Sequence, residues 1–354
     1  AADNCKNINI VPLDTIPNVI SGNDNGGISL WDTCTNSLIA GNIIGLNRTK
    51  TEAVGGNNGA GITFLRCDSI TIVENWIGGN TTGIGIWECS DFFIAGNRIG
   101  TDPEWTNDLM NSGDGIEIGH ESKRNMIMGN FIGNNSRDGI RITGIKAMYN
   151  TISENSISMN ESEGINLVDG ANSGIAAPKI TNLLENEIFG TASPLSIIEI
   201  YTDNDDEGRI IQDVVLSDSA GNWGWAGTIE GPFDSIRVTA TDTMGNTSEF
   251  GKYVPEEEPS SIEKTRQPIP FTLSQNYPGY HSEIHISFDL PAYTDVSLDV
   301  YNLSGVKVYG ISKGKLQTGH HSLSWNTSQH TAGIYLIRMQ TYRGALTKKC
   351  VVIK

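Results

Sequence analysis

The residues best able to do chemistry recur at fixed offsets from a repeated Gly-Ile step. Trp31 and Trp87 both stand three residues after the isoleucine of such a step, and Arg66 stands one position further along in the copy between them. Glu117 and Arg141 directly follow the isoleucine in two later copies. Exposed indole rings stack on the apolar faces of sugars, whose hydroxyls bond to carboxylates and guanidinium groups. These five residues therefore predict a glycan-binding face.

Each of these residues also has a purely structural interpretation. The two tryptophans could pack beneath one of two insertions in the repeat, residues 48–58 and 101–112. Glu117 and Arg141 could form an ion pair between neighbouring copies, which at an exposed site stabilises the fold by at most about 1 kcal/mol. Both interpretations stay open at the level of sequence.

Glu117, His120 and Arg141 are the candidate catalytic residues. Gly119-His120 and Arg141-Ile142 resemble fragments of polygalacturonase motifs, but the paired aspartates that such hydrolases use as acid and base are missing. A polysaccharide lyase needs a base near the uronate α-carbon and a neutralising cation, roles that His120 and Arg141 could fill. The constellation is incomplete for either reaction, so the sequence leans against catalysis.

An acidic loop, residues 203–208, offers oxygen ligands of the kind that calcium prefers. Asp203, Asp205 and Asp206 would be the ligands. The loop lacks the twelve-residue EF-hand frame, because no glutamate follows at the right place, and a solvated hairpin tip is the alternative. Calcium is the one cofactor that the sequence suggests.

An internal repeat positions all of these residues. The Gly-Ile step occurs six times, and the apolar residues that follow it alternate, which is typical of strands with one buried face. A second pattern, Ile-x-x-Asn-x-Ile, lies between the steps, at Ile39–Ile44, Ile72–Ile77, Ile94–Ile99, Ile127–Ile132 and Ile152–Ile157. The steps are 34, 22, 32, 24 and 25 residues apart, so one unit is too short to bury its own core, whereas stacked units can. This predicts a right-handed parallel β-helix.

The stacking makes specific residues neighbours. The first isoleucine of the second pattern should form one buried column, and the asparagine three residues later should form a ladder beside it, each amide bonding to the next. Cys34, Cys67 and Cys89 fall near the end of successive strands, which predicts a buried thiol column. A disulfide between stacked neighbours stays open, because coils about 4.8 Å apart are within its reach.

Composition excludes several partners. The net charge of −17 and the pI of about 4.7 argue against nucleic acid, because no basic stripe offsets phosphate repulsion. No apolar run is long enough to span a membrane. We expect a monomer.

Two resemblances complete the domain assignment. Asn18-Val19-Ile20-Ser21-Gly22-Asn23 and Gly41-Asn42-Ile43-Ile44-Gly45 resemble phrases of secreted bacterial β-helix repeat proteins, whose pectate-lyase-like fold hosts lyases, hydrolases and adhesins. The phrases Leu273–Pro278, Ile286–Pro291, Val300–Gly305, Ala332–Leu336 and Lys348-Lys349 resemble the C-terminal sorting domain of the Bacteroidetes type IX secretion system. The usual Asn-Pro-Phe is absent after Tyr277-Pro278. The second resemblance implies the type IX machinery as a partner and a secreted or surface-attached protein.

The fold class is therefore all-β: a right-handed parallel β-helix over residues 1–183, followed by two small Ig-like β-sandwich domains. Strands and turn signals predict the first sandwich over 184–254, composition predicts a linker over 255–268, and the sorting domain takes 269–354. The leading hypothesis is a protein that engages extracellular polysaccharide or another polymer without catalysis. The alternatives are a lyase or glycoside hydrolase acting on uronate-containing glycan, and a structural adhesin stalk.

Overall fold

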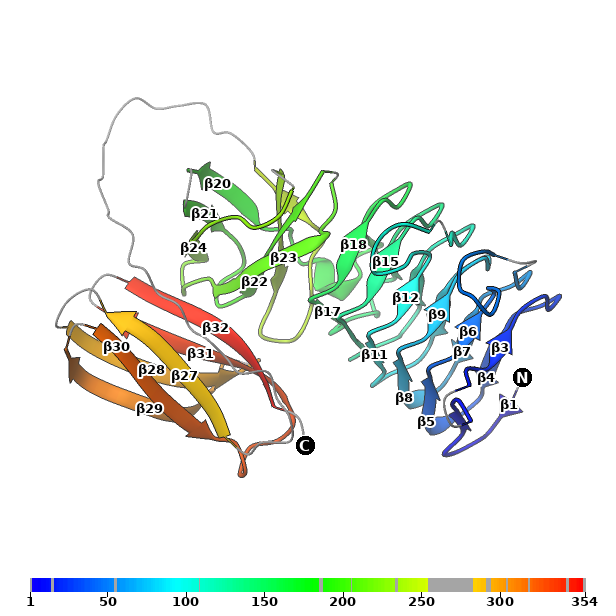
Figure 1. Cartoon of the computed structure of the whole chain (residues 1–354), viewed down its shortest axis with the longest axis horizontal. Helices are drawn as coiled ribbons and strands as arrows, with labels where there is room; N and C mark the ends of the chain where they lie inside the picture. The colour runs from blue at the N-terminus through cyan, green and yellow to red at the C-terminus, as the bar shows by residue number, and fades with distance from the viewer. Residues whose placement is uncertain are drawn as a thin grey trace.

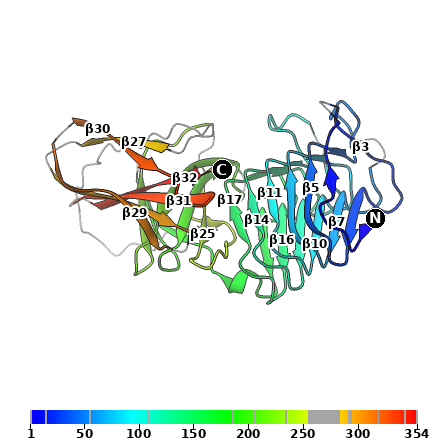
Figure 2. The same ribbon diagram turned by 90° about the horizontal axis from the view of Figure 1, so that it is seen from below.

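The computed structural model describes residues 2–13, 16–53, 56–107, 109–184, 187–204, 206–232, 235–253, 283–290, 294–303, 305–317, 319–341 and 344–352. Within these ranges the chain is almost entirely β, with a single short 3₁₀ helix, η1 (Asn172–Gly174). Three units follow one another along the chain: stacked coils, a pair of small antiparallel sheets, and a C-terminal antiparallel unit (Figures 1 and 2).

The first unit is a parallel β-helix, as predicted. Its strands stack coil upon coil into three sheets, and every pairing within them is parallel. The first sheet contains β1 (Ala2–Asp3), β4 (Ile28–Trp31), β7 (Ile62–Leu65), β10 (Ile84–Trp87), β13 (Ile116–Gly119), β16 (Ile140–Thr143) and β19 (Ile165–Val168). The second contains β2 (Asn9–Ile10), β5 (Thr35–Ala40), β8 (Asp68–Val73), β11 (Phe93–Ala95), β14 (Met126–Met128) and β17 (Thr151–Ser153). The third contains β3 (Val19–Ile20), β6 (Ile43–Ile44), β9 (Trp76–Ile77), β12 (Arg98–Ile99), β15 (Phe131–Gly133) and β18 (Ser156–Ser158).

The predicted isoleucine column and asparagine ladder are both confirmed. Ile39, Ile72, Ile94, Ile127 and Ile152 pair in register along the second sheet and are at most 3% exposed. Beside them each ladder amide donates to the side-chain oxygen of the next, through Asn42, Asn75, Asn97, Asn130 and Asn155. The same oxygens accept the backbone N–H of the preceding asparagine, so the ladder satisfies main-chain donors inside the turn.

A second asparagine ladder lies at the next turn of the coil, where the sequence did not predict one. It runs through Asn23, Asn57, Asn80, Asn111, Asn135 and Asn160. The thiol column is confirmed for Cys67 and Cys89, which are free and fully buried. The possible disulfide joins Cys34 to Cys5 in the preceding coil.

The second unit caps the open end of the β-helix. Its two antiparallel sheets contain β20 (Lys179–Leu183), β21 (Glu187–Thr191) and β24 (Asn222–Ala226) in one, and β22 (Ile197–Asp203), β23 (Ile210–Leu216), β25 (Ser235–Thr241) and β26 (Gly251–Lys252) in the other. Glu199 accepts the backbone N–H of Glu154, Glu207 accepts both donors of Asn160, and Glu249 accepts the N–H of Leu167. The N–H groups of the last coil have no following coil to donate to, and carboxylates of the second unit accept their hydrogen bonds instead.

The third unit has its own core. One sheet pairs β27 (Glu283–Leu290) with β30 (Gly319–Asn326), and the other contains β28 (Thr294–Asn302), β29 (Lys307–Leu316), β31 (Gly333–Thr341) and β32 (Gly344–Val352). Phe288, Leu298, Trp325 and Ile337 are buried between the sheets. Together with the second unit it gives the two Ig-like sandwiches that the sequence predicts.

Candidate functional site

The outer face of the first sheet carries the predicted glycan-binding residues in two columns. One column contains Ser29, Thr63, Gly85, Glu117, Arg141 and Asn166, which pair in register from coil to coil. The neighbouring column contains Trp31, Leu65, Trp87 and Gly119, also in register. The two tryptophans are therefore two coils apart in one column, which corresponds to about 10 Å between their α-carbons.

The indole of Trp87 lies over two glycines of the first sheet, Gly85 and Gly119. A Cβ built on Gly85 would be 2.3 Å from Cη2 of the indole, and one built on Gly119 would be 2.6 Å from Cδ1. The indole therefore covers both α-carbons, one on its own strand β10 and one on the next strand β13. Because both positions lack a side chain, the ring can lie along the sheet instead of standing on edge.

Glu117 stands beside this ring. It pairs with Gly85 across the coils and precedes Gly119 by two residues on β13, so it shares one patch of sheet with the two glycines beneath the indole. Glu117 is half-buried. Burial, and then the charge of Asp114, raise the pKa of its carboxyl. The patch thus presents an aromatic surface next to a carboxyl group that holds its proton more tightly than in water.

A charged network continues from Glu117 toward the last coil. Asp114 and Asp138, each followed by the Gly-Ile step, are at most 2% exposed. The backbone N–H of Asp138 donates to Oδ1 of Asp114, and burial raises the pKa of Asp114. Nη1 of Arg141 lies 3.0 Å from Oδ2 of Asp138, which also accepts the amide of Asn166. The ion pair between Arg141 and Glu117, which the sequence left open as the structural interpretation, does not form, because the guanidinium turns to the more deeply buried carboxylate on its own coil.

Two predicted residues lie at the rim of this face. Arg66 pairs with Asp32 of the preceding coil through an exposed ion pair that raises the pKa of the guanidinium, first by the hydrogen bond and then by charge. His120 is exposed and has a left-handed backbone (φ 58°) in the turn that follows β13. The catalytic trio is thus divided: Glu117 lies on the sheet, Arg141 is neutralised by Asp138, and His120 belongs to the turn.

Other tryptophans pack with the insertions. Trp76 contacts the cluster of Ile43, Leu46 and Leu109, and the Lys50 ammonium lies 4.6 Å from its ring centroid. Trp31, by contrast, is 42% exposed. Packing against an insertion therefore describes Trp76 better than it describes Trp31 and Trp87 of the first sheet.

The acidic loop has other partners for the ligands that the structure describes. Oδ1 of Asp203 accepts the Ser158 hydroxyl at 3.1 Å, and Asp206 pairs with Arg237 and Lys252. Asp205 lies outside the described residues. Across the rest of the described chain no three His, Cys, Asp or Glu side chains gather as metal ligands. The calcium site stays a prediction.

The sequence pointed to the columns of the candidate site but did not reveal two features of them. Asp114 and Asp138 each precede a Gly-Ile step, a signal that marks a carboxylate row but does not reveal that the row is buried. Gly85 and Gly119 give no signal, because a missing side chain matters only once a neighbouring ring covers it.

Comparison with known families assigns the C-terminal unit. Residues 278–354 match the model of the secretion system C-terminal sorting domain. This part of the chain is a type IX sorting domain. The sorting domain directs the protein out of the cell through the type IX system, to be attached to the cell surface or released. No helix within the described residues has the length and apolar character needed to cross a membrane.

Other similarities are remote. No curated protein matches the sequence. The full-length tailspike protein 2 of Escherichia coli O157:H7 bacteriophage CAB120 is 10% identical, with 94% of this chain and 50% of that chain covered and a TM-score of 0.25. The β-glucuronidase 3 of Bacteroides uniformis is 14% identical, with 50% of this chain but only 23% of that chain covered and a TM-score of 0.17. Likenesses this weak say nothing about function.

Proposed function

We propose that this secreted protein binds an extracellular polysaccharide along the outer face of the first β-helix sheet. The observation that carries the proposal is the indole of Trp87, laid across Gly85 and Gly119 beside Glu117. A ring that covers bare backbone with one face can offer the other to the apolar face of a sugar. Trp31, two coils away in the same column, would accept a second sugar unit of an extended chain.

The charges of the face favour a neutral glycan. Arg141 is already paired with Asp138, and Arg66 with Asp32, so neither guanidinium is uncommitted. Half-buried Glu117 adds its carboxyl oxygens to the face, and the whole chain has a net charge of −17. A uronate polymer would meet repulsion here, whereas hydroxyl groups can donate to these oxygens.

Glycoside hydrolysis is a second candidate, supported by one observation. A carboxyl whose pKa is raised by burial beside an aromatic ring is suited to protonate a glycosidic oxygen. Glu117 has that setting. A lyase mechanism receives less support, because the cation it would use, Arg141, is engaged by Asp138.

A panel of neutral and uronate polysaccharides tests both candidates. The protein is incubated with each polymer, and binding, reducing ends and absorbance at 235 nm are followed. Binding of a neutral glycan without new ends supports the proposal. New reducing ends that disappear in Glu117→Gln would establish hydrolysis instead, and a rise at 235 nm a lyase. Failure to bind any polymer would leave the adhesin stalk as the better account.

A further inference from the structure

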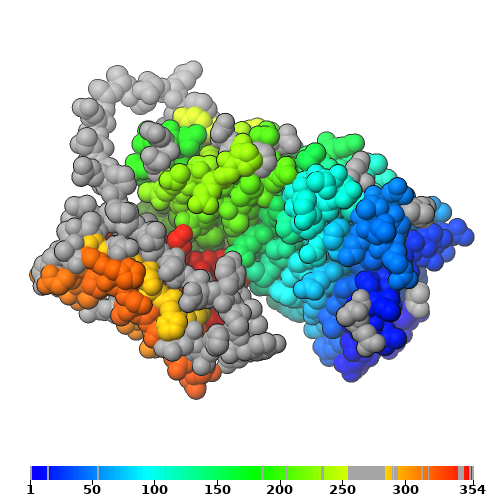
Figure 3. All heavy atoms as spheres, viewed as in Figure 1, coloured from blue at the N-terminus to red at the C-terminus, as the bar shows by residue number. Residues whose placement is uncertain are grey.

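The sorting domain is seated on the body of the protein, on the face of the second unit that caps the β-helix. Ile197 of β22, Val214 of β23 and Leu336 of β31 form a buried apolar cluster separate from the core of either unit, and Tyr301 and Leu303 pack around it. In the space-filling view the red atoms of the last strand meet the green atoms of the second unit (Figure 3).

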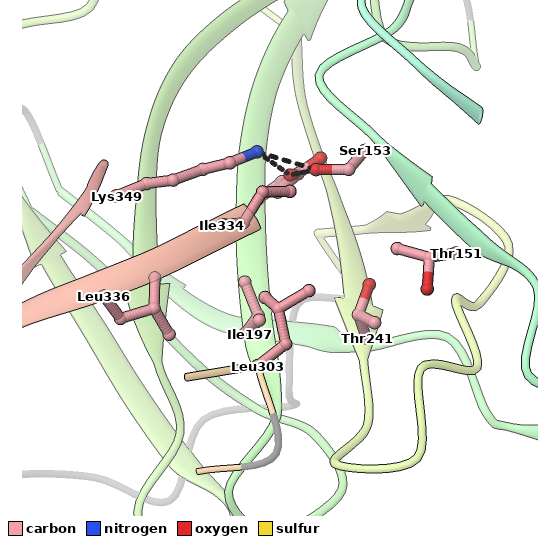
Figure 4. A pocket seen from close by; sticks show the side chains of 9 residues that line it. Thr151, Ser153, Ile197, Thr241, Leu303, Ile334, Leu336 and Lys349 are labelled. Carbon is pink, nitrogen blue, oxygen red and sulfur yellow. Dashed lines mark hydrogen bonds and ion pairs between the residues drawn. The ribbon is translucent and has the colours of Figure 1, made fainter. Parts of the chain in front are cut away.

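Lys349 of β32 enters a socket beside this cluster. Its Nζ lies 2.8 Å from Oγ of Ser153 (Figure 4), 2.9 Å from Oε1 of Glu154 and 3.5 Å from Oε1 of Glu199. The lysine side chain is only 7% exposed. The neighbouring Lys348 pairs with Asp213 of β23 at 2.8 Å. The end of the sorting domain is therefore held by two lysines in three ion pairs, and the Lys349 side chain is buried.

The body builds this socket with its own residues. Glu199 accepts the hydroxyl of Ser153, the hydroxyl of Tyr201 and the backbone N–H of Glu154. Burial raises the pKa of Tyr201 well above its usual value, so its hydroxyl remains a donor. If Lys349 leaves, Glu199 still has three donors and the ammonium regains water. Undocking therefore leaves no buried polar group without a hydrogen-bond partner on either side, which keeps the free-energy cost of undocking low.

We propose that this contact is an intramolecular latch: the sorting domain alternates between a docked state, with Lys349 in the socket, and an undocked state that presents the Lys348-Lys349 end of β32 to other partners. The occupant of the face is this chain's own sorting domain. The separate apolar cluster supports this, because Leu336 faces the body while its neighbours Tyr335 and Ile337 fill the sorting domain's own core. A small interface between units of one chain commonly opens and closes.

The reactivity of Lys349 toward an acylating reagent tests the latch in the full-length protein. Mass spectrometry compares its labelling rate with that of Lys307, whose side chain is 52% exposed. Leu336→Ser and Val214→Ser loosen the contact from either side, since both residues belong only to the interface cluster. Oxidative labelling of Trp325, fully buried in the sorting domain and read from its own peptide in the same mass spectra, reports whether that domain stays folded.

In the parent protein we expect Lys349 to react at least about tenfold more slowly than Lys307, and each variant to remove most of that protection with Trp325 unchanged. Equal rates in the parent would overturn the latch, as would full protection in both variants. Protection that appears only at high protein concentration would assign the face to a second copy of the chain and would also overturn it. If one variant unfolds the sorting domain, the labelling rate of Lys349 in the other variant decides whether the latch exists.

Discussion

Replacing Asn97 with alanine should remove a large part of the stability of the β-helix. Asn97 is fully buried in the middle of the first ladder. Its amide donates to Ile72 O at 2.9 Å and to Asn130 Oδ1 at 2.9 Å, and its oxygen accepts the backbone N–H and the side-chain amide of Asn75, both at 3.0 Å. The variant leaves the Asn75 N–H buried without its acceptor.

An orphaned buried donor costs about 1–3 kcal/mol, and each of the other three lost bonds about 1 kcal/mol, so we expect a loss of about 4–6 kcal/mol. Asn18→Ala is the matched control. Asn18 opens the same ladder, is half-buried and donates only through its side chain, to Val11 O and Asn42 Oδ1. Its loss should cost about 1–2 kcal/mol, since one of the two bonds is exposed to solvent.

Urea unfolding followed by far-ultraviolet circular dichroism measures both variants. The midpoint should fall strongly for Asn97→Ala and slightly for Asn18→Ala, with similar slopes. Equal shifts for the two variants would refute the reasoning, because they would show that the buried ladder is no more than a chain of exchangeable polar contacts.

Two further predictions concern charge and thiols. The raised pKa of Glu117 means that the folded state holds the proton more tightly than the unfolded state, so this residue costs stability as pH rises above the ordinary glutamate pKa. Glu117→Gln should therefore be more stable than the parent at pH 7 and equal to it near pH 3, by thermal unfolding at both values; a variant less stable at pH 7 would contradict the shift. The denatured, unreduced protein should show three thiols by colorimetric titration, since Cys5 and Cys34 are joined, and reduction should lower stability by about 3 kcal/mol, the scale for a loop of this size. Five titratable thiols before reduction would disprove the bridge.

The sequence predicts which residues stack in register wherever the spacing within the repeat is constant. The isoleucine column could be predicted in register, because an invariant offset of three residues links Ile39 to Asn42 and each later isoleucine to its own asparagine. The second ladder follows the same physics, but insertions interrupt its spacing. Asn80 follows Ile77 by three residues, whereas Asn57 follows Ile44 by thirteen, so no fixed offset reveals the pair.

The candidate site was predictable as columns and not as contacts. Alternation along a strand decides that Trp87 and Glu117 face outward. It does not decide where the indole lies or which carboxylate Arg141 chooses, because these depend on side-chain packing and burial between coils. The capping carboxylates were missed for a related reason. Glu199 and Glu249 come from a unit without the repeat, and only the fold brings them to the last coil.

Calorimetric titration of the Trp87→Ala protein with a glycan that the parent binds tests the central claim most directly. We expect binding to weaken by about 1–2 kcal/mol, the scale of a lost aromatic stacking contact, while thermal stability stays nearly unchanged. Trp76→Ala, at the indole that packs with the insertions, should instead lower stability and leave the affinity of the folded protein intact. His120→Ala should bind as the parent does. Undiminished binding by Trp87→Ala, or a loss of several kcal/mol in its stability, would contradict the proposal that this face of the β-helix binds glycan.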